Sequence, residues 1–84
     1  MSYFVYMLRC SDGTLYTGYT DDPQRRLGVH HRGKRAKYTR SRLPVELVYT
    51  EACPDKSAAL RREIALKKLT RQEKLALIAG KEAT

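Results

Sequence analysis

The 84 residues of this chain leave room for one domain, residues 1–84, and an apolar content of 42% is too high for a disordered chain. No stretch approaches the roughly 18 consecutive apolar residues of a membrane-spanning helix, so no membrane partner is expected. Seventeen lysines and arginines against nine acids give a formal net charge of +8, which favours a polyanionic partner.

The beginning of the chain predicts a β-hairpin. Residues 3–10 are rich in β-branched and aromatic side chains, which is typical of a strand, and residues 15–19 predict a second strand of the same kind. Asp12-Gly13 between them supplies residues that tolerate a tight turn. Gly18 is unexpected inside a strand, and it indicates either a β-bulge or a place where a ligand comes close to the backbone.

Helix-capping residues divide the rest of the chain. Asp22 and Pro23 are typical of the N-cap and first position of a helix, and Gly33 is typical of its end. Thr70 and Glu73 have the spacing of a capping box, which predicts the start of another helix. The expected elements are a helix over 23–32, a basic loop over 34–44, a strand over 45–51, and helices over about 54–69 and 70–80. This order, β-β-α-β-α-α, predicts an α+β fold with a three-stranded antiparallel sheet flanked by helices.

Two further features concern the cell compartment. Residues 1–6 contain neither the basic segment nor the small-residue cleavage site of a secretory signal, so a cytoplasmic protein is expected. Cys10 and Cys53 stand far apart, with no CxxC pair and no cysteine–histidine pair at metal spacing. In a protein that is not secreted, such cysteines are expected to be buried thiols rather than a disulfide or a zinc site.

The positive charge is concentrated in one part of the chain. Between Asp22 and Glu46 there is no acidic residue, whereas a merely solvated surface usually mixes both signs. This clustering predicts a binding surface for nucleic acid or another phosphate-rich partner. An anionic membrane is a weaker alternative, because the stretch lacks the apolar stripe of an interfacial helix. The residues expected to contact nucleic acid are Arg32, Lys34, Arg35, Lys37, Arg40 and Arg42.

Five polar side chains are candidates for a catalytic site. Strand alternation and the hairpin place Tyr6 and Tyr16 on one face of the sheet, near each other. Arg26 and His30 are about one helical turn apart and share a face of the first helix. Glu63 lies beside the apolar side of the second helix, where burial of its charge is costly without a partner. Taken singly, each has an ordinary explanation as a core aromatic, a solvated residue or a surface ion-pair former.

Taken together, these residues resemble the GIY-YIG nuclease domain over nearly the whole chain. Phe4-Val5-Tyr6 stands at the position of the family's Gly-Ile-Tyr, and Tyr16-Thr17-Gly18 at that of its Tyr-Ile-Gly. Arg26 matches the catalytic arginine and His30 follows one turn later, while Glu63 matches the metal-binding glutamate. The likeness is greatest to small stand-alone bacterial members. The catalytic residues that it implies are Tyr6, Tyr16, Arg26, His30 and Glu63, with Glu63 as the metal ligand.

The sequence departs from the family pattern at a few positions. Phe4, Val5 and Thr17 replace residues of the two tripeptides, but these are structural strand positions. No residue matches the asparagine that lies beyond the metal-binding helix in phage homing enzymes. Family members that choose a DNA site or structure usually carry a further module. A protein partner that supplies substrate specificity is therefore expected.

The resemblance implies a metal-dependent endonuclease that hydrolyses phosphodiester bonds of nucleic acid, with DNA as the expected substrate. A lone Glu63 suits Mg²⁺ or Mn²⁺, because Mg²⁺ commonly takes one or two protein carboxylates and completes its shell with waters and phosphate oxygens. Arg26 is suited to hold the scissile phosphate as a fixed cationic fork. Either Tyr6 or Tyr16 is expected to take a proton from the attacking water, and His30 either assists in proton transfer or binds phosphate.

Two other functions stay open at the level of the sequence. The same fold and basic surface would suit a catalytically silent nucleic-acid-binding module, although phosphate binding alone does not require Glu63, whose charge repels the ligand in the absence of a metal. A third reading is an interaction module whose basic surface serves a protein or RNA. The nucleic-acid structure that is cut also stays open, including any intermediate of DNA repair or recombination.

Overall fold

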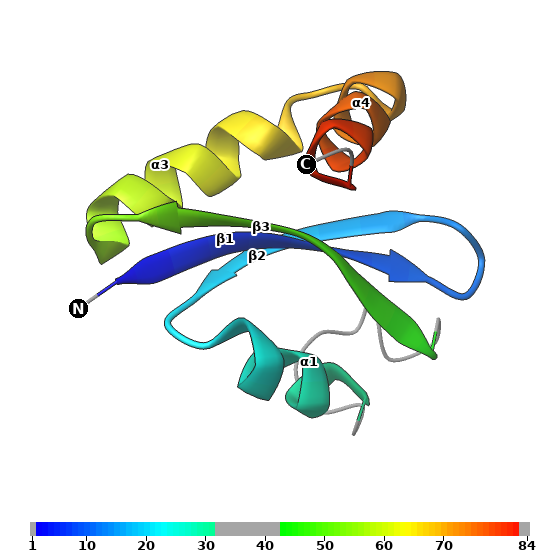
Figure 1. The fold of residues 1–84 in the computed structure, drawn as a ribbon, viewed down its shortest axis with the longest axis horizontal. Helices are drawn as coiled ribbons and strands as arrows, with labels where there is room; N and C mark the ends of the chain where they lie inside the picture. Colours follow the sequence, from blue (N-terminus) through cyan, green and yellow to red (C-terminus); the bar gives the residue numbers. More distant parts are fainter. Residues whose placement is uncertain (1, 32–42, 83–84) are drawn as a thin grey trace.

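The computed structural model describes residues 2–31 and 43–82. Its elements are β1 (Tyr3–Cys10), β2 (Leu15–Thr20), α1 (Pro23–His31), β3 (Val45–Cys53), α3 (Lys56–Lys67) and α4 (Arg71–Glu82). The strands form one antiparallel sheet in the order β2-β1-β3, so β1 is central and the other two are edges. Figure 1 shows α1 on one face of this sheet, with α3 and α4 on the other. The predicted α+β fold and element order are confirmed.

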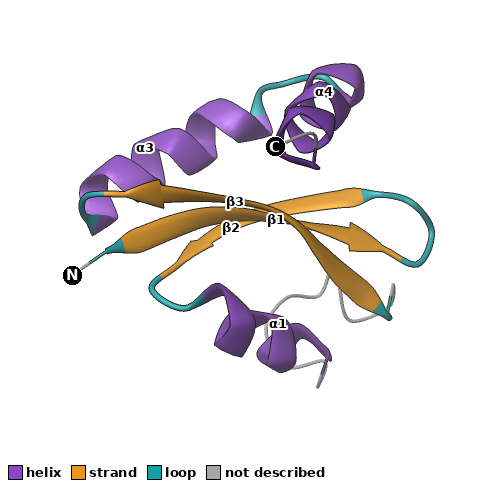
Figure 2. Ribbon diagram, in the orientation of Figure 1, coloured by secondary structure: helices purple, strands orange, loops and turns teal. Residues whose placement is uncertain are grey.

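The central strand is buried from both sides, because helices cover both faces of the sheet (Figure 2). Val5 and Met7 belong to the apolar layer under α3 and α4. Tyr6 and Leu8 alternate with them and belong to the layer under α1, which Leu27 of that helix completes. The position of a β1 side chain along the strand therefore determines which of the two apolar layers it enters.

The predicted caps are present at the helix starts. The Asp22 carboxylate accepts a hydrogen bond of 3.1 Å from the Arg25 backbone N–H and so caps α1. Thr70 and Glu73 form the predicted capping box, in which each backbone N–H donates to the other residue's side chain, at 2.8 and 3.2 Å. Asp55 caps α3 in the same manner as Asp22 caps α1. These short-range bonds explain why the sequence predicted the helix starts well.

Several element ends differ from the prediction by one or two residues, and three of them have a clear physical reason. β3 runs to Cys53 rather than residue 51, because its pairing with β1 continues to that residue. α3 ends at Lys67 rather than residue 69, where a tighter hydrogen-bonded turn replaces the helix. α4 passes through Gly80, which lacks the positive φ of a helix-ending glycine; among the described residues only Gly13 has one, at 85°. The predicted end of the first helix at residues 32–33 lies outside the described residues.

A network of three side chains joins β3 to α3. Glu51 Oε1 accepts a hydrogen bond of 2.7 Å from the Tyr49 hydroxyl, and Glu51 Oε2 accepts one of 2.8 Å from Arg62 Nε. Burial by itself raises the pKa of the Glu51 carboxyl, but the hydrogen bonds from Arg62 and Tyr49 and the nearby positive charges outweigh it and lower that pKa. Burial and the Glu51 carboxylate raise the pKa of the Tyr49 hydroxyl.

The cysteines and the helix lengths complete the description of the fold. Cys10 and Cys53 are free and buried, as predicted. In the described part of the chain, no helix combines the length and the apolar composition that crossing a membrane requires.

Candidate active site

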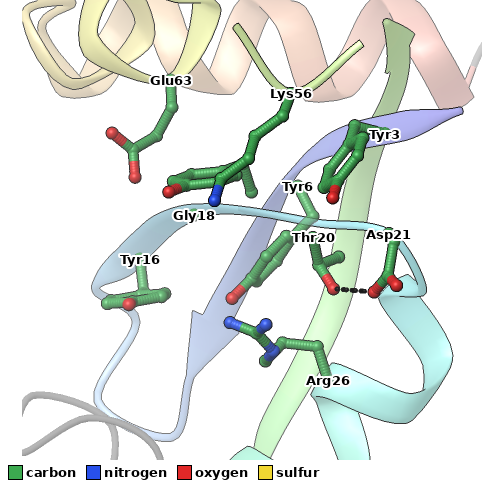
Figure 3. Close-up of a pocket in the computed structure, with 10 residues that line it drawn as sticks. Tyr3, Tyr6, Tyr16, Gly18, Thr20, Asp21, Arg26, Lys56 and Glu63 are labelled. Carbon is green, nitrogen blue, oxygen red and sulfur yellow. Dashed lines mark hydrogen bonds between the residues drawn. The ribbon is translucent and has the colours of Figure 1, made fainter. Parts of the chain in front are cut away.

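A pocket of about 290 Å³ lies at the β2 edge of the sheet (Figure 3). It takes side chains from α1 and from α3, which cover opposite faces of the sheet. Four of the five predicted catalytic residues line it, namely Tyr6, Tyr16, Arg26 and Glu63. The other lining residues are Tyr3, Gly18, Tyr19, Thr20, Asp21 and Lys56.

Gly18 lies in this pocket directly opposite Tyr6 in the β1–β2 ladder. The register is continuous through this pair, so the β-bulge considered for Gly18 is wrong. The Tyr6 ring lies over the glycine instead, because a Cβ at position 18 would be 2.6 Å from Tyr6 Oη and 2.7 Å from its Cζ. Tyr16 stands on the same face, with its ring centroid 6.4 Å from that of Tyr6. The absent side chain of Gly18 thus makes room for the Tyr6 ring.

His30 does not line the pocket but lies against the two tyrosines, and it is fully buried. Its Nε2 is 3.1 Å from Tyr6 Oη. The imidazole centroid lies 6.1 Å from that of Tyr6 and 5.1 Å from that of Tyr16, in edge-on geometry. A residue without exposed surface is poorly placed for direct contact with a phosphate. Its geometry suits proton exchange with the Tyr6 hydroxyl instead.

Arg26 and Glu63 reach the pocket from opposite sides of the β2 edge. Figure 3 shows the Arg26 side chain pointing from α1 into the pocket that Tyr6 also lines, and the Glu63 carboxylate pointing from α3 towards β2. Arg26 forms no ion pair with any acid in the described part of the chain. The Glu63 side chain is only 12% exposed, and its Oε2 lies 3.5 Å from Lys67 Nζ. Within the described residues, the pocket therefore combines a cation that forms no ion pair with a carboxylate that pairs with Lys67.

A divalent metal ion in this pocket would depend on Glu63. Among residues 2–31 and 43–82, no three His, Cys, Asp or Glu side chains gather closely enough to hold an ion by themselves. Asp21, the other acid of the pocket, already accepts a hydrogen bond of 2.7 Å from Arg25. A single carboxylate suits Mg²⁺ that shares its shell with waters and phosphate oxygens. The donor set fits an ion bound together with a phosphate ligand, and it does not fit a closed structural metal site.

Several pocket side chains were not anticipated from the sequence, among them Tyr3, Tyr19 and Lys56. Tyr3 and Tyr19 belong to the layer under α3 and α4, so strand alternation separates them from Tyr6. Only Lys56 carries a local signal, since it is a cation at the first position of α3, where acids are preferred. The predicted nucleic-acid contacts between residues 32 and 42 lie outside the described residues.

Comparison with known proteins identifies the family to which this fold and pocket belong. A model of the GIY-YIG catalytic domain matches residues 2–76, and the chain therefore belongs to the GIY-YIG catalytic domain family. The resemblance predicted from the two tripeptides is confirmed. Membership places the chain in a nuclease family and implies nucleic-acid binding.

The more particular likeness is to small bacterial UPF0213 proteins. One from Streptococcus agalactiae is 59% identical over 75 residues, 89% of this chain and 85% of that protein. One from Staphylococcus aureus is 56% identical over 77 residues, 92% of this chain and 94% of that protein. The solution NMR structure of the UPF0213 protein from Bacillus halodurans shares 49% identity with a TM-score of 0.60, covering 94% of this chain and 84% of that one. A solved protein from E. faecalis shares 41% identity with a TM-score of 0.65, covering 100% and 90%.

Proposed function

We propose that this protein is a metal-dependent endonuclease that hydrolyses phosphodiester bonds in DNA. One observation carries the proposal: Tyr6, Tyr16, Arg26 and Glu63 come from four different elements and converge on one pocket. A pocket for phosphate binding alone needs only cations. The phenols and the carboxylate add the groups that water activation and metal binding require.

Arg26 holds the scissile phosphate. A guanidinium is a planar, positively charged fork of N–H donors that matches phosphate oxygens. Because the Arg26 side chain already points into the pocket that Tyr6 lines, little reorganisation is needed when negative charge develops on the phosphoryl group (Figure 3).

Tyr6 is the general base that takes the proton of the attacking water. His30 first takes the proton of the Tyr6 phenol, which leaves Tyr6 as the phenolate that this role requires. At pH 7 only about one free tyrosine in a thousand is ionised, and lowering its pKa to 7 requires roughly 4 kcal/mol. The distance of 3.1 Å from Tyr6 Oη to His30 Nε2 suits that transfer, and the positive charge of Arg26 favours the phenolate. Tyr16 packs on the same imidazole and is the alternative base.

Glu63 would hold Mg²⁺ or Mn²⁺, and such an ion, when bound, supplies positive charge to the phosphoryl and leaving-group oxygens. Lys67, at 3.5 Å, competes with the ion for the carboxylate. Metal binding is therefore expected to be weak in the absence of nucleic acid.

A catalytically silent nucleic-acid-binding module is the second candidate function. The observation that favours it is the Glu63–Lys67 ion pair, because this pair compensates the carboxylate without any metal. In that case Arg26 would bind phosphate, and Tyr6 and Tyr16 would serve only the packing around His30.

A cleavage assay distinguishes the two functions. Purified protein is incubated with flap, splayed, nicked, single-stranded and duplex DNA, with Mg²⁺, with Mn²⁺ and with EDTA. Cleavage of at least one substrate that requires the metal supports the endonuclease. Binding that persists unchanged in EDTA without any product supports the binding module and contradicts the endonuclease.

Glu63→Gln links any cleavage to this pocket. The substitution removes the carboxylate that would hold the ion, so cleavage is expected to be abolished while DNA binding is kept or strengthened. The matched control is Glu46→Gln, which changes an exposed carboxylate whose side chain is 66% accessible and which lies outside the pocket. If Glu63→Gln cuts as fast as the control, the metal-dependent mechanism is wrong for this protein.

A further inference from the structure

We propose that a second basic surface binds the nucleic-acid backbone on one side of the scissile phosphate. This surface, named the edge track, consists of Lys56, Lys67, Arg71 and Lys74. It runs along the β2 edge from the pocket to the β1–β2 hairpin. The inference rests on the proposed nuclease function, whose substrate the edge track would position.

The edge track lies near β2 because α3 packs against β2 as well as against β1. Lys56 lines the pocket at the start of α3, and Lys67 near its end pairs with a carboxylate of the same pocket. Arg71 and Lys74 of α4 line a second hollow, of about 200 Å³, with Leu15 at the start of β2. Figure 1 shows α3 running over the sheet from the chain's beginning towards the hairpin, and α4 lying over the hairpin half of the sheet.

Most of the edge track carries positive charge that no acid of the described residues pairs with. Within the described residues, Lys56, Arg71 and Lys74 take part in no ion pair. Lys56 and Arg71 also occupy the first positions of α3 and α4, where the helix dipole disfavours a cation. Helix stability does not explain these placements, whereas a polyanion passing along the β2 edge would be attracted by all of them.

The distance along β2 sets how far from the cut these contacts fall. A strand rises about 3.3 Å per residue, so Gly18 in the pocket and Thr14 in the second hollow are about 13 Å apart. One strand of a duplex carries a phosphate for about every 3.4 Å of helix axis. Arg71 and Lys74 therefore meet phosphates within about four nucleotides of the scissile bond, and the substrate must extend that far on this side.

The test compares two double variants that remove the same charges from different surfaces. Arg71→Gln/Lys74→Gln neutralises the hairpin end of the edge track. Arg61→Gln/Lys68→Gln also removes one arginine and one lysine, both exposed, from α3 and from its C-cap. By helix geometry these positions lie about 140–160° around the α3 axis from Glu63. Circular dichroism and the thermal midpoint first establish that both variants fold. Affinity for a fluorescently labelled DNA duplex is then measured by anisotropy between about 50 and 200 mM salt.

Arg71→Gln/Lys74→Gln is expected to flatten the slope of log affinity against log salt by about 1.8, at roughly 0.9 per lost contact. The loss of affinity should be largest at low salt, and Arg61→Gln/Lys68→Gln should keep nearly the wild-type slope. Equal slopes for the two variants overturn the edge track and leave the proposed nuclease intact. If the two variants show these different salt slopes but the wild-type protein cuts no substrate, the edge track is supported and only the nuclease is contradicted. Wild-type protein that neither binds nor cuts DNA overturns both.

Discussion

At the scale of single residues, the Tyr6 hydroxyl connects the pocket with the buried interior, where His30 Nε2 lies 3.1 Å away. Tyr6→Phe removes only this hydroxyl, so packing hardly changes and a loss of rate reports chemistry. Loss of a general base typically costs about 10²–10⁴-fold. Single-turnover cleavage by Tyr6→Phe is expected to slow by this factor, with nearly unchanged DNA affinity. Normal cleavage by both Tyr6→Phe and Tyr16→Phe would refute a tyrosine base and favour the binding module.

Gly18 provides a second prediction at the residue scale. Gly18→Ala places a methyl group 2.6 Å from Tyr6 Oη, so the Tyr6 ring or the strand must shift. Overpacking of this kind costs about 1–3 kcal/mol, which urea unfolding measures. The control is Gly80→Ala, because a Cβ there meets nothing within 4 Å and alanine favours the helix. Equal stability of wild type and Gly18→Ala would mean that the Tyr6 ring moves aside freely.

At the scale of secondary-structure elements, Glu51 ties the edge strand β3 to α3. Its hydrogen bonds to Tyr49 and Arg62 are partly exposed, with accessibilities of 31% for the Glu51 side chain and 40% for the Arg62 side chain. Solvent screening therefore reduces the contribution of these hydrogen bonds to stability. We expect Glu51→Gln to lower the free energy of unfolding by about 1 kcal/mol at pH 7. For a domain of this size, that corresponds to a fall in the thermal midpoint of about 4–8 °C.

The same network predicts a dependence of stability on pH. Because folding lowers the pKa of Glu51, its contribution is fully present above the ordinary glutamate pKa of 4.5 and is lost as the pH falls through the lower folded-state value. The thermal midpoints of wild type and Glu51→Gln should therefore converge in acid. Glu46→Gln, which breaks a more exposed pair with Arg9, serves as the control. A constant difference between wild type and Glu51→Gln across this range would contradict the assignment.

At the scale of the whole molecule, the net charge of +8 is expected to govern association with DNA. The acid-free stretch supplies its own share of contacts, predicted from the sequence at residues 32–42. Neutralising two of its cations, as in Lys34→Gln/Lys37→Gln, should flatten the salt slope for duplex DNA by about 1.8. An unchanged slope, measured beside Arg61→Gln/Lys68→Gln, would move the binding surface away from this stretch.

The sequence by itself determined the features that depend on near neighbours. The hairpin at Gly13, the N-cap Asp22 and the capping box of Thr70 and Glu73 all follow from residues within a few positions of each other. The common face of Tyr6 and Tyr16 also follows, because side chains alternate along paired strands. The catalytic roles of these residues stay predictions.

Only the tertiary structure decided how distant parts of the chain meet. Glu63 and Arg26 belong to helices that cover opposite faces of the sheet. Both side chains line one pocket because β2 is an edge strand around which they can reach. The packing of α1 on the sheet buries His30, and the packing of α3 places Lys56 at the pocket. Helix and strand periodicity assign a side chain to a face of its own element. Which other elements that face meets depends on contacts between residues far apart in the chain, which local rules do not contain.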